Sequence, residues 1–382
     1  MINNNEITIR TVIISDIEEL KKFFITAYGA QTIFQNDVFL MHYFDSRING
    51  MDPMSKCLIG LNHEGEIVSH YGGLYYNLKL NNEIHSIIWG VSAYTLPEWR
   101  GKGINSKMVD YLLENNGING VIGFTKETAN FYKKLNYNIF NFDRFSRYIL
   151  ILDVEKTLDV IEYIKQDRDK ITELKQIQPS ETHHQKFDKI VELTKENIRN
   201  FKLNIDEELT EITTTHRTVD FLIWRFLENP FIKYEIYGFV KNREVYAYIA
   251  LREEILNPLN YKVNRIIDLY GKKEVINILL EKTLHISVLK KHLYIDFSMY
   301  GSLYEKELIS SKFLKLENEE CCILPQVTAP IENRPNREYI GIQSKFYYIE
   351  IEKLSKENVY FTRMDSDRDR LAKISQINLN YK

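Results

Sequence analysis

A short glycine-containing turn between a strand and a helix most constrains how this chain can fold. The turn runs from Leu96 to Ile104 and places Gly101 and Gly103 directly before a segment whose apolar residues recur at helical spacing. Glycines let successive main-chain N–H groups point toward one place, and the start of a helix adds free N–H groups and the positive end of its dipole. The sequence therefore predicts an anion cradle, to which Arg100 and Lys102 add positive charge.

The residue pattern around this turn predicts an α/β (α+β) fold. Alternation of apolar and polar residues predicts strands, and apolar residues three and four apart predict helices. Residues 1–152 then read as an N-terminal domain with the order β-α-β-β-β-α-β-α and a closing strand. The strands are expected at 7–10, 57–61, 67–76, 84–94, 121–124 and 148–152, and the helices at 16–28, 104–115 and 128–135.

The second half repeats this order more weakly. A charge-rich connector is expected at 153–186 and a C-terminal domain at 187–382, so two mixed-sheet domains are predicted. Two halves with one order indicate a divergent duplication, or only the alternation that any α/β domain shows. Helices are expected at 187–200, 274–290 and 303–310 and before 227, a hairpin at 234–251, and strands at 265–270 and 293–297.

Charge and cysteine content narrow the functional classes. There are 50 Lys and Arg against 53 Asp and Glu, a net charge of −3, which gives no electrostatic reason to expect nucleic acid as a partner. No apolar run approaches 18 residues and the first residues lack a secretory signal pattern, so no membrane span is expected. Cys57, Cys321 and Cys322 are too few and too badly spaced for a disulfide framework, which favours a cytoplasmic protein.

The segment from Arg100 to Asn105 resembles motif A of the GNAT family of acyl-CoA-dependent N-acyltransferases, Arg/Gln-x-x-Gly-x-Gly/Ala. Ala129 to Tyr137 is similar to the family's motif B, Phe-Tyr-x-x-Leu-Gly-Phe, although Asn105 and Asn136 replace small residues of the two motifs. The resemblance covers about residues 6–150 and implies a GNAT fold with acyl-CoA as donor, whose pantetheine pairs with main-chain groups at 93–96. The donor-binding residues it implies are Ala93, Thr95, Arg100, Gly101, Lys102, Gly103, Ile104, Asn105 and Asn130.

Acyl transfer from a thioester to an amine needs a neutral amine, a donor for the developing oxyanion, and a proton for the leaving thiolate. Tyr132 matches the motif-B tyrosine and is the candidate proton donor, unless it only packs on its helix with its hydroxyl in water. His70 precedes two glycines and is the candidate base, unless it is only hydrogen-bonded within its strand. Glu98, His85 and Asp268 are lesser candidates for the base, and a water chain could replace it.

The second half offers no counterpart of the cradle. The turn from Gly271 to Glu274 lacks the motif-A pattern, so we expect this degenerate GNAT half to bind no coenzyme A and to supply acceptor contacts. Its Trp-Arg segment and its closing segment, Tyr360 to Arg370, resemble tandem-GNAT proteins of bacterial surface-polysaccharide pathways, which acylate amino sugars carried on nucleoside diphosphates. The substrate contacts implied by this resemblance are Trp224, Arg225, Asp268, Asp365, Asp367 and Arg368.

The resulting hypothesis is an acyl-CoA-dependent N-acyltransferase that acts on a nucleotide-linked amino sugar in a ternary complex. The amine attacks the thioester directly. A homodimer is compatible with the sequence. No metal is expected, because Arg370 and Gln376 stand where a calcium-binding loop needs glycine and glutamate. Two alternatives stay open: an aminoglycoside, peptide or protein amine as acceptor, and a coenzyme A-binding protein without catalysis.

Overall fold

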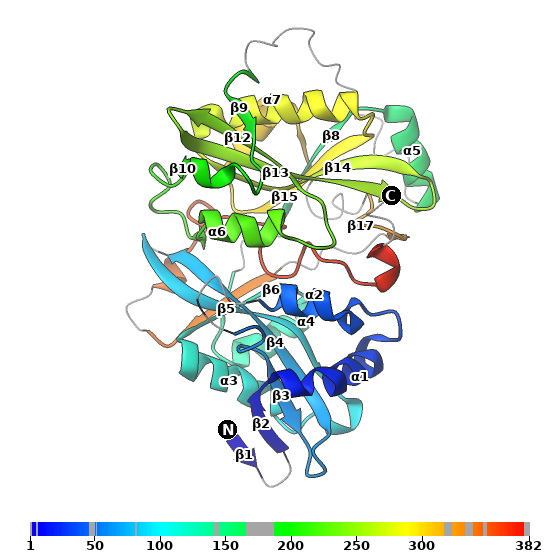
Figure 1. Ribbon diagram of the computed structural model, residues 1–382, viewed down its shortest axis with the longest axis vertical. Coiled ribbons are helices and arrows are strands. Elements are labelled where there is room, and N and C mark those ends of the chain that lie inside the picture. Colours follow the sequence, from blue (N-terminus) through cyan, green and yellow to red (C-terminus); the bar gives the residue numbers. More distant parts are fainter. Residues whose placement is uncertain are drawn as a thin grey trace.

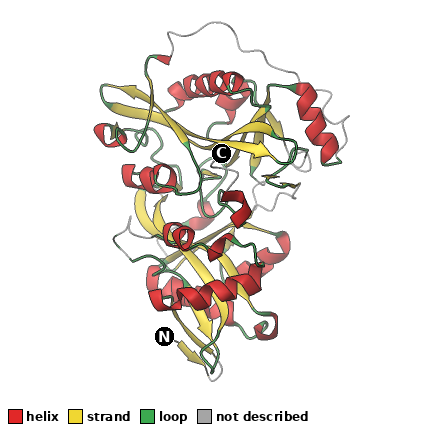
Figure 2. Ribbon diagram, turned by 45° about the vertical axis from the view of Figure 1, so that its right-hand side comes forward, coloured by secondary structure: helices red, strands yellow, loops and turns green. Residues whose placement is uncertain are grey.

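The computed structural model describes residues 2–4, 7–45, 50, 52–80, 82–140, 145–165, 187–316, 323–332, 339–346 and 350–377. The molecule is elongated and has two lobes, each built around a mixed sheet, with the C-terminal segment lying between them (Figure 1). Helices lie against the sheets of both lobes (Figure 2). The predicted α/β fold with two mixed sheets is therefore confirmed.

The first sheet positions the predicted cradle. In spatial order it contains β1 (Ile2–Asn4), β2 (Ile7–Thr11), β3 (Leu58–Leu61), β4 (Ile67–Leu80), β5 (Glu83–Thr95), β6 (Ile118–Phe124), β19 (Tyr339–Ser344) and β7 (Asn138–Ile139), and β11 (Thr214–Thr215) pairs with β4. α1 (Ile17–Tyr28) and α2 (Asp37–Tyr43) contribute to one apolar cluster, whereas α3 (Ile104–Asn116) and α4 (Lys126–Lys134) contribute to another. The two helix pairs therefore cover opposite faces of the sheet.

Local sequence explains the helices that border the site. Leu20, Phe23 and Phe24 recur at helical spacing and are the buried residues of α1, which ends at Gly29 with a φ of 89°. α4 begins at a threonine cap, where the Thr125 hydroxyl oxygen accepts the N–H of Thr128 at 3.3 Å.

The second sheet forms the other lobe. In spatial order it contains β16 (Leu314–Leu316), β8 (Ser146–Ile151), β15 (Tyr294–Tyr300), β14 (Tyr261–Gly271), β13 (Glu244–Leu256), β12 (Glu235–Lys241) and β9 (Ile190–Glu192). β10 (Lys202–Leu203) pairs with β13, and β20 (Phe361–Thr362) pairs with β15. The other elements are α5 (Val154–Tyr163), α6 (Val219–Leu222) with the π-helical η8 (Ile223–Leu227), α7 (Lys273–Leu289), α8 (Glu305–Ser310) and the small β17 (Val327–Thr328) and β18 (Ile331–Glu332) hairpin.

The two sheets share a central arrangement. β3, β4 and β5 pair antiparallel, and β6 then pairs parallel to β5 after the crossover helix α3. β12, β13 and β14 likewise pair antiparallel, and β15 pairs parallel to β14 after α7. This correspondence lets the start of α3 be compared directly with the start of α7.

Several sequence-based expectations need correction. The sheets exchange strands across the predicted boundaries, because β8 lies before residue 152 but joins the second sheet, and β19 lies after 187 but joins the first. The helix expected at 187–200 is wrong, since β9 pairs there with the edge of β12. The expected connector begins with α5, and residues 166–186 lie outside the described part of the chain.

The C-terminal segment joins the two lobes. Ser366 donates its main-chain N–H to the Tyr76 hydroxyl of β4 at 2.9 Å, while β20, a few residues earlier, pairs with β15 of the second sheet. Farther along, Ile33 donates its N–H to the carbonyl of Ala372 at 3.1 Å. The segment therefore contacts both sheets near the middle of the molecule, where it is drawn in red in Figure 1.

Candidate active site

The predicted cradle has an open backbone at the start of α3. Gly101 and Gly103 have φ angles of 77° and 73°, in the left-handed region that glycine adopts without a steric penalty. A Cβ atom added to either glycine would meet nothing within 4 Å. Among the described residues, no acceptor takes the main-chain N–H groups of Gly101, Gly103 or Ile104. These groups and the 13-residue helix behind them suit a phosphate or pyrophosphate.

Asn105 occupies a polar niche beneath the cradle. Its Oδ1 accepts hydrogen bonds from the Thr95 hydroxyl at 3.1 Å and the Ser69 hydroxyl at 3.3 Å. The side chain therefore turns toward the ends of β4 and β5. This explains how asparagine can replace the small residue of motif A without filling the cradle.

The two basic residues of the turn lie against aromatic rings. Arg100 is exposed, donates Nε–H to the carbonyl of Thr95 at 3.0 Å, and lies over the Tyr94 ring at 5.3 Å. Lys102 is also exposed, with Nζ 4.2 Å from the centre of the Trp99 ring. Both charges thus stay beside the turn, where they can meet a bound anion.

A bulge and a divergence of strands extend the site from the cradle into the sheet. The register of β4 against β5 shifts between His70 and Gly72, and Ser92, in the strand opposite, has a φ of 51°. Pairing of β5 with β6 ends at Trp89, although β5 continues to Thr95. Ala93 is exposed. The last residues of β5 can therefore pair with an extended ligand lying between the two strands.

Tyr132 lies on α4 beside this divergence. Its ring packs 4.9 Å from that of Phe124 on β6 and 5.1 Å from that of Tyr137. Burial raises the pKa of the Tyr132 hydroxyl to about 12. The phenol is therefore protonated at neutral pH and can act as a proton donor. Asn130, on the same helix, is exposed.

His70 is fully buried under the bulge. Nδ1 lies 3.1 Å from the Ser92 carbonyl, which can only accept, so Nδ1 carries the proton and Nε2 has the free lone pair. Nε2 has no partner among the described residues. Burial lowers the pKa of His70 to about 4, opposed by the Ser92 contact, which makes the neutral ring a weak base. Glu98 is exposed in the turn, and His85 pairs with Glu83 at 3.3 Å.

Trp224 and Arg225 line a narrow pocket between the lobes. The Trp224 indole N–H donates to the His42 carbonyl at 3.2 Å, and Arg225 Nε–H donates to the Met364 carbonyl at 2.9 Å. The pocket holds about 20 Å³, enough for a water-sized group such as an amine or hydroxyl. Tyr43 Oη, Arg225 Nη2 and Ser366 Oγ line it, and each is buried without a hydrogen-bond partner in the described structure.

The other four predicted substrate residues fall into two groups. Asp367 and Arg368 line a larger cavity of about 220 Å³ on the far side of the C-terminal segment. Asp268 and Asp365 are fully buried and line neither of these two spaces. Arg217 holds Asp268 through contacts of 2.8 and 3.1 Å, and the Thr362 N–H donates to Asp365 at 2.6 Å. Both carboxylates therefore fix the C-terminal segment and the sheet.

Sequence reasoning did not identify Tyr43, Ser366 or Arg363 as lining residues. Ser366 and Arg363 belong to the closing segment, in which the resemblance implies contacts only from Asp365, Asp367 and Arg368. Tyr43 lies at the end of α2, which the sequence pattern did not predict. Its position only becomes visible once α2 is packed against β4 and η8.

The described residues give little support for a metal site, a cysteine nucleophile or a membrane span. Within the described residues, no group of three or more His, Cys, Asp and Glu side chains is arranged to hold a metal ion. Cys57 is buried, and burial raises its pKa to about 12, so it is not an activated nucleophile. Cys321 and Cys322 lie outside the described residues. No described helix has the length and hydropathy required to cross a bilayer.

Comparison with known proteins identifies the fold. No protein-family model and no curated protein sequence matches the chain. A conserved protein of unknown function and probable N-acyltransferase from Enterococcus faecalis V583 superposes with a TM-score of 0.54 at 10% identity, over 88% of this chain and 72% of that one. The chain has the GNAT fold.

Two further structures show the same likeness. Saccharomyces cerevisiae N-myristoyltransferase with bound myristoyl-CoA gives a TM-score of 0.53 at 10% identity, over 90% of this chain and 79% of that one. A GCN5-related N-acetyltransferase from Kribbella flavida gives a TM-score of 0.50 at 9% identity, over 88% of this chain and 72% of that one. At these identities the likeness concerns the fold, and it confirms the GNAT architecture predicted from motifs A and B.

Proposed function

We propose that this protein is an acyl-CoA-dependent N-acyltransferase. The observation that carries the proposal is the open left-handed backbone at Gly101 and Gly103, placed where β5 and β6 diverge. The pyrophosphate of coenzyme A would bind the N–H groups at the start of α3, and pantetheine would pair with β5 near Ala93 and Thr95. The N-acyltransferases among the structures of similar fold, one of them with bound myristoyl-CoA, support this donor.

The reaction needs no covalent enzyme intermediate. The neutral amine attacks the carbonyl carbon of the thioester, the C–S bond breaks, and the thiolate takes its proton from Tyr132. The amine nitrogen loses a proton to His70 or to water, and solvent returns a proton to Tyr132. The low pKa of His70 makes it a weak base, although a stronger one than water. The ternary complex supplies the proximity that a nucleophilic side chain would otherwise provide.

The proposed acceptor is an amino sugar carried on a nucleoside diphosphate, in surface-polysaccharide synthesis in the cytoplasm. The two spaces beside the C-terminal segment support it, since one is narrow and lined by Trp224 and Arg225 and the other is larger and lined by several arginines. An acceptor bound there would lie on the α1 and α2 face of the first sheet, because Leu74 and Tyr76 of β4 line the narrow space.

Release of free thiol from acetyl-CoA and longer acyl-CoAs tests the proposal. The acceptor panel contains dTDP-, UDP- and GDP-linked amino sugars, an aminoglycoside and a peptide with a free N-terminus. We expect turnover with a nucleotide-linked amino sugar. Turnover with the aminoglycoside or peptide alone would overturn the acceptor, and binding of acyl-CoA without turnover on any amine would overturn the enzyme and favour a non-catalytic coenzyme A-binding protein.

A further inference from the structure

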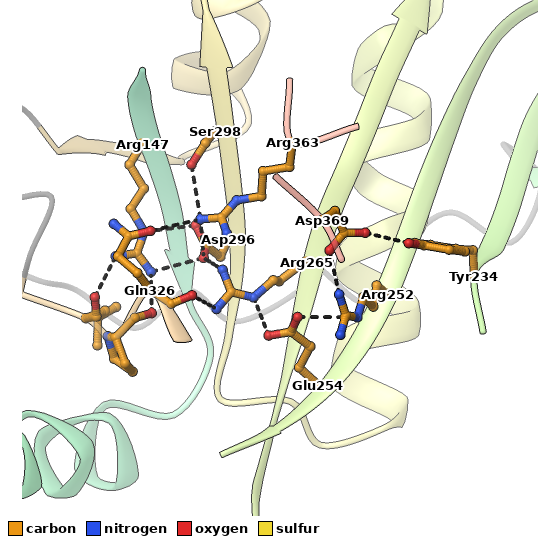
Figure 3. Close-up of polar contacts among 12 residues, drawn as sticks. Arg147, Tyr234, Arg252, Glu254, Arg265, Asp296, Ser298, Gln326, Arg363 and Asp369 are labelled. Carbon is orange, nitrogen blue, oxygen red and sulfur yellow. Dashed lines mark hydrogen bonds and ion pairs between the residues drawn. The ribbon is translucent and has the colours of Figure 1, made fainter. Parts of the chain in front are cut away.

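A cavity of about 220 Å³ lies between β13, the β17–β18 hairpin and the C-terminal segment. Basic side chains outnumber acidic ones in its lining by five to four. The basic residues are Arg252, Arg363, Arg368, Arg370 and Lys373, and the acidic residues are Glu254, Glu332, Asp367 and Asp369. Figure 3 shows the inner wall, where arginines from β8, β13, β14 and the C-terminal segment converge.

Three of the acidic residues already have cationic partners. Glu254 pairs with Arg265 at 2.5 Å and with Arg252 at 3.3 Å, and Asp369 pairs with Arg252 at 2.5 Å. Asp367 pairs with Arg370 at 3.2 Å. The acidic lining therefore offers little charge to neutralise a further cation.

Asp296, which lies behind the inner wall of the cavity, also has several arginine partners. Arg147 contacts it at 3.0 Å through both Nε and Nη2, and Arg265 contacts it at 2.8 Å. Arg363 reaches the same carboxylate only at 3.4 Å. In this network four arginines, 147, 252, 265 and 363, face three carboxylates, those of Glu254, Asp296 and Asp369.

Arg363 is the arginine with the poorest contacts in this network. It is 93% buried (7% exposed), and its Nη2 group makes only long contacts, 3.3 Å to Ser298 and Gln326 and 3.4 Å to Asp296. Its Nε–H has no partner among the described residues. A buried guanidinium without close acceptors is costly unless an anion compensates it. Burial, against the opposing effect of Asp296, lowers the pKa of Arg363 to about 10.

We propose that this cavity is a phosphate-binding subsite in which Arg363 is the principal anchor. The planar guanidinium can donate to two oxygens of one phosphate, through Nε and a terminal nitrogen. The subsite deepens the proposed function and rests on it for its biological ligand, the diphosphate of the acceptor.

The position of the cavity fits this role. It shares Asp369 and Arg370 with the narrow pocket that contains Arg225 and Tyr43. An acceptor with its diphosphate at Arg363 could therefore extend past the C-terminal segment toward β4. Its amine end would then approach the side of the sheet on which His70 and the bulge lie.

Titration calorimetry with inorganic pyrophosphate tests the subsite directly. The protein is first saturated with desulfo-coenzyme A, so that the cradle at Gly101 and Gly103 is filled. We expect pyrophosphate to bind wild type, and Arg363→Met to weaken this binding about tenfold or more. Arg199→Met, which removes an exposed arginine in an ion pair with Asp220, is the matched control and should bind as wild type does. Equal binding by Arg363→Met, or no binding by wild type, would overturn the subsite.

Thermal unfolding gives a second readout. Arg147 and Arg265 still neutralise Asp296 in Arg363→Met, so the variant should fold without pyrophosphate. Pyrophosphate should raise the unfolding temperature of wild type and leave that of the variant unchanged. Glucuronate serves as a carboxylate probe. If the protein bound glucuronate but did not bind pyrophosphate, the phosphate assignment would be overturned.

The proposed function and the subsite can fail separately. Arg363-dependent pyrophosphate binding in a protein that acylates no amine would support the subsite and overturn the enzyme. Acylation of a nucleotide-linked amino sugar with the same KM in wild type and Arg363→Met would support the enzyme and overturn the subsite.

Discussion

Each lobe contains a strand–turn–helix unit, β5 to α3 in the first and β14 to α7 in the second. The turn is open in the first lobe and closed in the second. After β5, the N–H groups of Gly101 and Gly103 have no acceptor among the described residues, and the space above both glycines is open. After β14, the Gly271 N–H donates to the Tyr304 hydroxyl at 2.9 Å and the Lys272 N–H donates to the Tyr246 carbonyl at 2.9 Å. A Cβ on Gly271 would collide with the backbone of its neighbouring strand. The second turn is thus closed by the protein itself.

The diverging strands differ in the same way. β14 and β15 stop pairing at Ile266 and Phe297, as β5 and β6 stop at Trp89. Met299 of β15 pairs with β8 on one side and with Thr362 of β20 on the other, so β20 lies on the β14 side and fills the gap. The second lobe therefore uses its own C-terminal segment where the first leaves room for a ligand. This explains physically why we expect one coenzyme A per chain.

The largest expected effect is on stability in the filled gap. Tyr360 is fully buried, its hydroxyl donates to the Leu269 carbonyl, and its ring lies 5.3 Å from that of Tyr304. Tyr360→Ala should lower the free energy of unfolding by about 3–5 kcal/mol, measured with urea. Tyr94→Ala, at the partly exposed end of β5, is the control and should cost much less. Equal costs, or two coenzyme A molecules bound per chain by calorimetry, would break the comparison.

Removal of the proton donor at the open gap should have the next largest effect. Tyr132→Phe should lower kcat for acyl transfer about 10²-fold, because the thiolate then leaves without a positioned proton. Affinity for desulfo-coenzyme A should be unchanged, since binding depends on the cradle. Tyr111→Phe, a partly exposed tyrosine of α3, should keep the kcat of wild type. If Tyr132→Phe also keeps it, the hydroxyl has no role in catalysis.

A substitution at Gly103 can strain the backbone of the cradle without filling the space between β5 and β6. Valine at Gly103 must adopt a left-handed backbone or shift the turn, at a cost of about 1–2 kcal/mol, so Gly103→Val should weaken desulfo-coenzyme A binding about tenfold. Gly65→Val imposes similar strain, since Gly65 has a φ of 84° and open space in the turn between β3 and β4. That control should bind as wild type does. Equal losses in the two variants would mean that the affinity change reports general strain.

Sequence reasoning predicted the open region well and the closed region poorly. The strands, the helix and the glycines around residues 96–104 follow from local periodicity and backbone freedom. The insertion of β19 beside β6, the closing of the second gap by β20, and the pairing of β9 with β12 all join residues far apart in the chain. No local pattern encodes such pairing. The spacing of apolar residues therefore predicts a helix at 187–200, although part of this segment pairs as a strand with the edge of β12.

The candidate site shows the same limit. The sequence predicts Asp268 as a substrate contact, whereas the structure pairs its carboxylate with the buried Arg217. The resemblance implies that Asp365 and Asp367 contact the substrate, whereas the Asp365 carboxylate accepts hydrogen bonds from Thr215 and Thr362. Which side chain of such a segment faces a cavity depends on packing between the lobes.

The smallest expected effect is a pH dependence in the filled gap. Burial, opposed mainly by Arg217, raises the pKa of Asp365 to about 6, so the folded protein holds this proton more tightly than the unfolded chain does. The contribution of Asp365 to stability is therefore fully present below the unfolded pKa and is lost as pH rises toward 6. Asp365→Asn can keep the contacts with Thr215 and Thr362 without titrating. Between pH 5 and 6 the variant should gain about 1 kcal/mol in the free energy of unfolding relative to wild type, measured with urea. If the difference in unfolding free energy between variant and wild type stayed constant from pH 5 to 6, the Asp365 carboxylate would be ionised throughout this range. The filled gap of the second lobe would then tolerate a buried charge as the open gap of the first lobe would.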